Sequence, residues 1–313
     1  VDPHTHLEKG DLLACGLPVT VLRPSLVYSM TGSYGGSSLL RALAAAPGLL
    51  PVPGLGKQLI QPLHARDLAA VVVAALEESA EPDSASSMVN VVGPEQLTIA
   101  QFLRGLRRWL RLPGAPILPV PMSLLGIAGA IGDWLGDGPL GSAMVRMLAR
   151  GNVSTLADHA YLQARFGIAP RSFAWWQAQE PSHVQDRWHA RLYPLEPLRR
   201  WGLGLTCLLS AMAGFAQSPT QIVQLAEALP ISAAVAAFLG YAGSSLDAVL
   251  GAMLIGNWRT RLAGNVLLLV VLAYTVILGF YMPDLWLDPW GALAKNLTIL
   301  PAILIWRVLA DRQ

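Results

Sequence analysis

Ionised side chains are scarce in this sequence of 313 residues. Only 13% of its residues are Asp, Glu, Lys or Arg, whereas 53% are hydrophobic and the mean hydropathy is +0.46. Because soluble domains carry charge on about a quarter of their residues, this composition excludes an ordinary soluble protein. The formal net charge is only +2 and no basic, aromatic-rich patch is present, so no nucleic-acid partner is expected.

Cysteine is nearly absent as well. Cys15 and Cys207 lie far apart, in parts of different composition. No disulfide between them is expected, which fits a reducing compartment. The sequence shows no signal-peptide pattern and starts with Val1 in the middle of a helical pattern. We therefore expect the first residues of the natural protein to lie upstream.

The few charges are unevenly spread. Residues 201–313 carry ten of the 42 charged residues, and all six histidines precede position 190. Leu262–Met282 is a run of 21 residues without a charge, long enough to cross a hydrocarbon layer about 30 Å thick. We therefore predict a soluble part, an amphipathic connector rich in tryptophan and arginine, and a membrane part, at residues 1–172, 173–200 and 201–313.

The membrane part is predicted to be an all-α domain of four spans. The spans are expected at residues 201–217, 241–258, 262–282 and 292–306. Pro230, Gly240 and Gly243 are expected to break the long apolar run 228–258, which would leave a short re-entrant helix at residues 231–239.

Basic residues predict the orientation of these spans. With four spans, six arginines fall on one side of the bilayer: Arg199, Arg200, Arg259, Arg261, Arg307 and Arg312. Loops rich in Lys and Arg face the cytoplasm. We therefore predict a multi-pass protein of the inner, cytoplasmic membrane. Its soluble domain and both termini would be cytoplasmic, where NAD(P) is available.

Strand and helix patterns alternate in the soluble part, which is typical of α/β folds. We predict a partial doubly wound, Rossmann-like parallel sheet with a substrate subdomain. Strands are expected at residues 19–28, 59–63 and 88–92, an extended segment at 116–121 and a loop at 47–57. Helices are expected at residues 39–46, 67–78, 99–112 and 122–135. Ligands of this fold class bind at the carboxyl ends of strands, here residues 24–28 and 63–66.

Two of the expected helices carry further predictions. The helix at 99–112 is expected to present Arg104, Arg107, Arg108 and Arg111 on its outer side. The helix at 122–135 is apolar but too short to span a bilayer. It is expected either to pack within the soluble domain or to lie on the bilayer surface.

Four short motifs carry a family resemblance. They are, in chain order, Leu22-Arg-Pro-Ser-Leu-Val-Tyr28, Gln61-Pro-Leu-His-Ala-Arg-Asp-Leu-Ala69, Val89-Asn-Val-Val-Gly-Pro-Glu-Gln-Leu-Thr98 and Phe166-Gly-Ile-Ala-Pro170. Each is weak alone, but in this order they resemble the extended and atypical short-chain dehydrogenase/reductase proteins of the NAD-dependent epimerase/dehydratase family. The order is most similar to the subgroup of the 39-kDa accessory subunit of respiratory complex I.

The resemblance implies NAD or NADP as cofactor. In that family the backbone of the first motif meets the nicotinamide, which implies a cofactor-binding role for Pro24, Ser25, Leu26 and Val27. It also implies that Gln61, His64 and Asp67 border a pocket for a small-molecule substrate. The residues alone leave a structural alternative open, with His64 buried at a strand end and Asp67 in the first turn of a helix.

Two features of the family are not matched. The family cradles the pyrophosphate with GxxGxxG after its first strand, and we expect no such motif in this chain. Its chemistry uses a Tyr-x-x-x-Lys pair, in which the lysine lowers the pKa of the tyrosine. The chain's lysines are Lys9, Lys57 and Lys295, and no tyrosine stands four residues before any of them. No catalytic residue is therefore predicted.

The last 115 residues resemble the DoxX-like membrane family. The resemblance rests mainly on Pro283-Asp-Leu-Trp-Leu-Asp-Pro-Trp-Gly291 and the following Lys295-Asn-Leu-Thr298. Relatives in that family are similar to a thiosulfate:quinone oxidoreductase component, which implies a membrane redox partner or a quinone. Asp247 falls within a predicted span, where a charge costs about 2.5–3.5 kcal/mol. We expect it to form either a hydrogen bond between helices or a proton or quinone site.

Two functions from different classes are compatible with these patterns. The first is a membrane-anchored, NAD(P)-dependent enzyme of the epimerase/dehydratase or reductase type, present here without its N-terminal portion. The second is a non-catalytic NAD(P)-binding scaffold or assembly factor of a membrane redox complex. The ligand-side motifs favour the enzyme, whereas the unmatched Tyr-x-x-x-Lys pair favours the scaffold.

Overall fold

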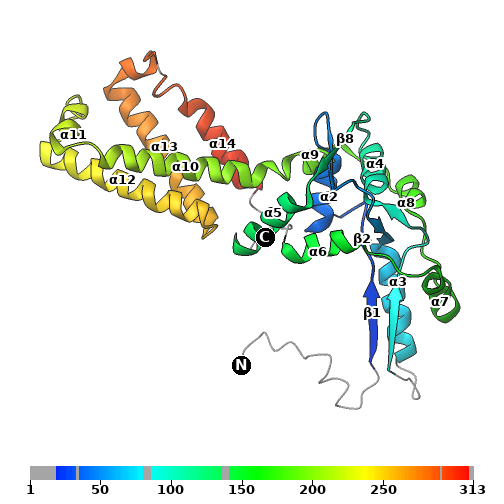
Figure 1. Cartoon of the computed structure of the whole chain (residues 1–313). Coiled ribbons are helices and arrows are strands. Elements are labelled where there is room, and N and C mark those ends of the chain that lie inside the picture. The colour runs from blue at the N-terminus through cyan, green and yellow to red at the C-terminus, as the bar shows by residue number, and fades with distance from the viewer. Residues whose placement is uncertain (1–18, 33–34, 80–85, 136–140, 290, 310–313) are drawn as a thin grey trace. The chain divides into compact units, whose positions relative to one another are not determined.

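The computed structural model describes residues 19–32, 35–79, 86–135, 141–289 and 291–309 (Figure 1). Contacts within the chain divide it into two compact units, Val1–Tyr193 and Pro194–Gln313. The predicted domain limits at residues 172 and 200 stay predictions.

The strands of the first unit pair two by two. β1 (Thr20–Pro24) lies parallel to β6 (Ser87–Val91), and β2 (Val27–Tyr28) lies parallel to β5 (Leu63–His64). β3 (Leu50–Pro53) lies parallel to β8 (Ile117–Val120), whereas β4 (Leu59–Ile60) and β7 (Leu97–Thr98) are antiparallel. Parallel strands separated by helices confirm the predicted α/β class. In the described residues they form four two-stranded sheets, so the larger doubly wound sheet stays a prediction.

The predicted single strand at 19–28 was wrong, because the chain changes partners in its middle. Pro24 has no N–H with which to continue a ladder. The Ser25 N–H donates to the Val91 carbonyl at 3.0 Å, whereas the Leu26 carbonyl accepts from the Leu63 N–H at 2.9 Å. The segment 47–57, predicted as a loop, contains β3, and the predicted strand 59–63 is divided between β4 and β5.

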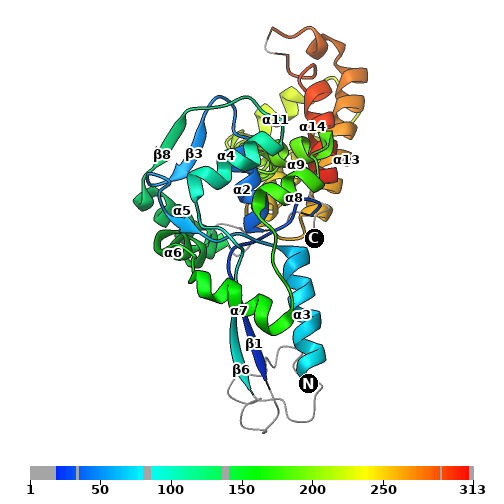
Figure 2. The same ribbon diagram turned by 90° about the vertical axis from the view of Figure 1, so that its right-hand side faces the viewer.

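Helices flank these strand pairs. Those described in the first unit are α2 (Gly36–Ala44), α3 (Ala65–Ser79), α4 (Ile99–Trp109), α5 (Met122–Leu135), α6 (Ser142–Arg150), α7 (Leu156–Phe166), α8 (Phe173–Gln179) and α9 (Val184–Leu192). Figure 2 shows α3 and α7 beside the pair formed by β1 and β6, and contacts join these elements.

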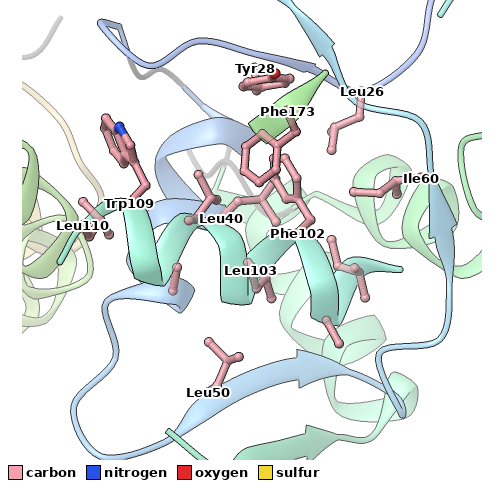
Figure 3. Packing of buried hydrophobic residues seen from close by; sticks show 14 of the residues in the cluster. Leu26, Tyr28, Leu40, Leu50, Ile60, Phe102, Leu103, Trp109, Leu110 and Phe173 are labelled. Carbon is pink, nitrogen blue, oxygen red and sulfur yellow. The ribbon is translucent and has the colours of Figure 1, made fainter. Parts of the chain in front are cut away.

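The largest buried cluster of the first unit surrounds α4. Thr98 begins this helix with a capping box, in which its hydroxyl accepts from the Gln101 N–H and the Gln101 side chain accepts from the Thr98 N–H. Figure 3 shows Phe102 and Leu103 of α4 among buried side chains from β3, α2 and α8. Burying such side chains contributes roughly 1.5–3 kcal/mol each, so α4 is the central packing element of this unit.

Arg107 corrects the predicted outer face of this helix. Its side chain is buried and donates to the carbonyl oxygens of Ala44, Ala46 and Pro113 at 2.9, 2.8 and 2.6 Å. The first two carbonyls lie at the C-terminal end of α2, where the last carbonyl groups of a helix have no partner within the helix. Arg107 therefore joins α4 to the end of α2, while Arg104, Arg108 and Arg111 are exposed as predicted.

The first part of the predicted connector belongs to the first unit. Phe173 and Trp176 of α8 and Ala190 of α9 are buried in the cluster around α4. Trp109 of α4 donates its indole N–H to the Glu180 carbonyl at 2.6 Å. Whether residues 173–200 also contact a bilayer stays a prediction.

The second unit is helical. It contains α10 (Leu195–Phe215), α11 (Pro219–Leu225), α12 (Ala233–Ile255), α13 (Thr260–Tyr281), the short 3-10 helix η1 (Pro283–Trp286) and α14 (Asn296–Leu309). Among the described residues, α12 and α13 are long and apolar enough to cross a membrane. The number of four spans therefore stays a prediction.

The predicted break near Gly240 and Gly243 was wrong, because α12 is one continuous helix of 23 residues that begins after the cap Ser232. A glycine inside a helix costs about 1 kcal/mol and does not by itself end the helix. Here both glycines allow close packing. A Cβ on Gly240 would lie 2.7 Å from the Ile222 side chain, and one on Gly243 would lie 2.6 Å from the Tyr274 hydroxyl.

We expect Gly93→Ala to destabilise the first unit by about 3 kcal/mol, because its Cβ would lie 1.8 Å from the Pro62 carbonyl oxygen. Gly114→Ala is the matched control, since no atom lies within 4 Å of the added Cβ. Pulse proteolysis in urea on the detergent-solubilised chain measures both variants. Equal midpoints for the two would contradict this account of Gly93.

Candidate functional site

A polar cleft lies at the carboxyl ends of β1 and β6. The register places Arg23 opposite Asn90 and Pro24 opposite Val91, so the two parallel strands end together. The cleft has a volume of about 150 Å³ and opens to solvent. It is lined by Arg23, Pro24, Ser25, Asn90, Val92, Asn152, Val153 and Ser154. This is the edge at which α/β folds bind ligands.

The wall opposite the strands is the loop before α7, which hydrogen bonds hold in place. The backbone of Asn152 accepts from the Gln61 N–H and donates to the Leu59 carbonyl, both at 2.9 Å. Gly151 precedes it with a φ of 78°, a conformation that favours glycine. The loop is therefore tied to β4 and the residue after it.

Gln61 connects this wall to the strand ends. Its side chain is fully buried. Its amide nitrogen donates to the Gly93 carbonyl at 2.8 Å, and its amide oxygen accepts from the Ser154 N–H at 3.0 Å. The Ser25 hydroxyl donates to the Gln61 carbonyl. The Gln61 amide is thus committed to shaping the cleft.

Asn90 and Ser154 complete the polar lining, and Asp158 lies behind them. The Asn90 amide lies 3.4 Å from the Ser154 hydroxyl and 3.5 Å from Asp158 Oδ1. Asp158 also accepts from Ser154 and Thr155. These hydrogen bonds, those from Ser154 first, lower the pKa of Asp158. The cleft therefore has a carboxylate just behind its wall.

The predicted cofactor-binding residues fall into two groups. Pro24 and Ser25 line the cleft, whereas Leu26 and Val27 lead away from it into β2. Leu26 is buried in the cluster around α4. The sequence motif thus includes the strand end that borders the cleft, while the cofactor-binding role of these residues stays a prediction. It missed Asn152, Val153 and Ser154, because a loop more than a hundred residues downstream carries no local pattern that links it to β1.

His64 and Asp67 lie away from the cleft, in a second cluster where α8 packs on β5 and α3. The His64 ring is buried and stacks on Trp176, with ring centroids 3.7 Å apart, and Tyr28 meets it edge-on at 5.2 Å. Asp67 accepts from the Trp176 indole N–H at 2.9 Å and from the Arg171 N–H at 3.0 Å. The structure therefore separates these two residues from Gln61.

At neutral pH the two ring side chains at the centre of this second cluster, His64 and Tyr28, are uncharged. His64 Nδ1 accepts from the Arg66 N–H at 3.3 Å, and its Nε2 lies 3.7 Å from Glu180 Oε2. Burial lowers the pKa of His64 to about 4 although the charge of Asp67 raises it. Burial first, and then the charges of Asp67, Glu95 and Glu180, raise the pKa of Tyr28. Glu180 and Trp176 were not singled out in the sequence.

The spacing GxxGxxG does occur once, at Gly126, Gly129 and Gly132, so the expectation that the chain lacks it was wrong. All three glycines lie inside α5. In a phosphate cradle the glycines form the loop between a strand and the free N–H groups of a helix N-terminus. Here a Cβ on Gly129 would lie 3.1 Å from the Val145 side chain. Gly129 therefore serves the packing of α5 on α6, whereas no atom lies within 4 Å of a Cβ placed on Gly126.

The sequence comparisons identify the second unit. Residues 204–305 match the sequence model of the DoxX-like family. The second unit thus carries a DoxX-like domain. This match confirms the resemblance found at Pro283–Gly291. Among curated protein sequences, none matches the chain significantly.

Solved structures resemble the chain only distantly. They include dTDP-glucose 4,6-dehydratase from Bacillus anthracis in complex with NAD, with 18% identity and a TM-score of 0.38, covering 56% of this chain and 47% of that one. RMD from Pseudomonas aeruginosa complexed with NADPH has 14% identity and a TM-score of 0.37, covering 57% and 50%. The human epimerase family protein SDR39U1 with NADPH has 20% identity and a TM-score of 0.34, covering 48% and 44%. The chain thus spans about half the length of these proteins.

In the DoxX-like domain, Asp247 of α12 accepts a hydrogen bond from the Ser210 hydroxyl of α10 at 2.6 Å. The structure therefore shows the bond between helices that was one of the two expectations for this residue. Nearby, Asn296 donates to the Thr275 hydroxyl at 2.8 Å and so links α14 to α13. Within a membrane such bonds contribute about 0.6–1.7 kcal/mol each.

Asp247→Asn should leave the thermal stability in detergent unchanged, because the asparagine oxygen can still accept from Ser210. Asp247→Leu removes the acceptor and should lower stability by about 1 kcal/mol. Circular dichroism at rising temperature measures both, with the neighbouring, exposed Leu246→Ala as control. If Asp247→Asn destabilised as much as Asp247→Leu, the charge rather than the bond would be what matters.

The stability of the first unit should fall in mild acid because of His64. Its pKa is about 4 in the folded chain against 6.5 in the unfolded chain, so the unfolded state binds the extra proton between these values. Stability is then full above pH 6.5 and decreases as the pH falls toward 4. The expected loss is about 2 kcal/mol between pH 6.5 and 5.

Pulse proteolysis in urea across this pH range measures the loss. His64→Phe keeps a ring stacked on Trp176 but cannot titrate, so its urea midpoint should decline less between pH 6.5 and 5. Parallel curves for the two proteins would show that His64 does not cause the loss.

Proposed function

We propose that this protein is a membrane-anchored, NAD(P)-binding protein of the epimerase/dehydratase type, in which the cleft beside β1 and β6 receives the nicotinamide end of the cofactor. The DoxX-like domain anchors it in the inner membrane, with the first unit on the cytoplasmic side. The observation that carries the proposal is the position of this cleft at the carboxyl ends of two parallel strands.

The residues present fit one end of the cofactor. The cleft offers backbone from Arg23 to Ser25 and the neutral polar side chains of Asn90 and Ser154, which suit an uncharged carboxamide. Its volume of about 150 Å³ accommodates a single planar ring rather than a whole dinucleotide. The described residues contribute no glycine loop for the pyrophosphate. The nicotinamide supplies hydride chemistry when bound, and these residues would orient its ring.

A scaffold without catalysis is the second candidate. The polar side chains around the cleft are engaged in holding its walls, as Gln61 and Ser25 show. The chain also has no Tyr-x-x-x-Lys pair. In this case the nucleotide would stabilise the first unit and its contacts with a membrane redox partner, and no small-molecule substrate would be turned over.

Because the described residues offer a site for the nicotinamide end and none for the pyrophosphate, we expect the chain to bind NADH with a dissociation constant weaker than micromolar, on the order of a millimolar. NADH fluorescence, titrated with the purified chain in detergent, measures this value. Val153→Trp should abolish the signal by filling the cleft from its exposed rim, whereas Val153→Ala should retain it. Binding unaffected by Val153→Trp, or micromolar affinity, would contradict the proposed site.

The same titration separates the two candidate functions when it is followed by a turnover assay. Slow exchange of hydrogen from NADH into a nucleotide-sugar substrate pool would support the enzyme. Binding that raises the urea midpoint of the first unit without any exchange would support the scaffold.

A further inference from the structure

Helix α5 has an apolar face that the described part of the first unit does not cover. Leu124, Ile127 and Ile131 are 56%, 59% and 48% exposed. The opposite side of the helix packs on α6 through Gly129. A helix that is apolar all round is normally enclosed by protein or lipid, so the exposed face requires a covering partner.

The helix that packs against α5 carries positive charges. Arg146 and Arg150 of α6 are exposed, and α6 contains no acidic residue. Asp133, the acidic residue of α5, accepts from the Ser142 N–H at 3.1 Å and so is engaged in starting α6. The helix pair α5 and α6 therefore presents exposed aliphatic side chains on one helix and exposed arginines on the other, a composition compatible with a bilayer interface that contains anionic lipid.

The length of α5 and the apolar helices elsewhere in the chain also indicate a bilayer as the partner. Its 14 residues span about 21 Å along the axis, too short to cross the hydrocarbon layer but suited to lying along its surface. The same chain carries the apolar helices α12 and α13 and a DoxX-like domain. The first unit is thus joined along the chain to a domain that resembles a membrane family.

We propose that the exposed face of α5, formed by Leu124, Ile127 and Ile131, inserts into the surface of the bilayer that holds the DoxX-like domain, with Arg146 and Arg150 against anionic headgroups. The first unit then has two attachments to the membrane, the covalent one through α10 and this reversible one. This second contact does not depend on whether the cleft binds a nucleotide.

The test uses the full chain in proteoliposomes. A bimane label is placed at Ile127→Cys in a Cys15→Ser, Cys207→Ser background, and its quenching by lipids brominated on their acyl chains is compared with a label at Ala160→Cys, an exposed position on α7. We expect the label at 127 to be quenched at least about twofold more, because such helices sit 5–10 Å deep at the boundary between headgroups and acyl chains. Equal quenching at both positions would overturn the proposal.

Two further measurements identify what covers the exposed face of α5. Charge reversal, Arg146→Glu with Arg150→Glu, should reduce quenching at 127 in vesicles of phosphatidylcholine with phosphatidylglycerol and leave it unchanged in phosphatidylcholine alone. A label that is blue-shifted but not quenched by brominated lipid in either mixture would mean that protein, such as a second copy of the chain, covers α5. That result would overturn the proposal as well.

Discussion

The Gln61 amide is the constraint on which the candidate site depends. One fully buried side chain bonds the backbone after β6 and the backbone of the loop before α7, and its own carbonyl receives the Ser25 hydroxyl after β1. These three segments are far apart in the sequence. A buried amide left without partners costs about 1–3 kcal/mol per lost bond, so the three segments are held at fixed separations. The cleft exists because these separations leave a gap between strand ends and loop.

The local elements of the first unit were largely predictable. The helix expected at 99–112 begins at the residue where α4 begins, and the helices expected at 67–78 and 122–135 lie within two residues of the limits of α3 and α5. Two of the misses have the same cause. Arg107 is buried because the end of α2 needs donors, and the chain changes partners after Pro24 because β5 lies beside it. Both features depend on segments that are distant in the sequence. Local periodicity carries no information about contacts with such segments.

The candidate site shows the same difference between features set by local sequence and features set by distant segments. The motif around Arg23 and Pro24 located one wall, because strand ends are visible in a sequence. The other wall, Asn152 to Ser154, was not predictable from local pattern. The family resemblance grouped His64 and Asp67 with Gln61 at one pocket. In the structure they face α8, where His64 stacks on Trp176 and Asp67 accepts its indole N–H. They couple the end of the soluble fold to its strands.

In the DoxX-like domain, several polar side chains form hydrogen bonds within and between helices. Ser210 donates to Asp247, Asn296 to Thr275, and Ser244 and Thr275 bond the carbonyls four residues earlier. In a hydrocarbon medium water cannot replace such partners. Glycines at the closest approaches, Gly204 against Gly251 and Gly214 against Ser244, bring α10 and α12 near enough for the Ser210–Asp247 bond. The continuous α12 follows from this, because its glycines serve contact with neighbouring helices rather than a break in its own backbone.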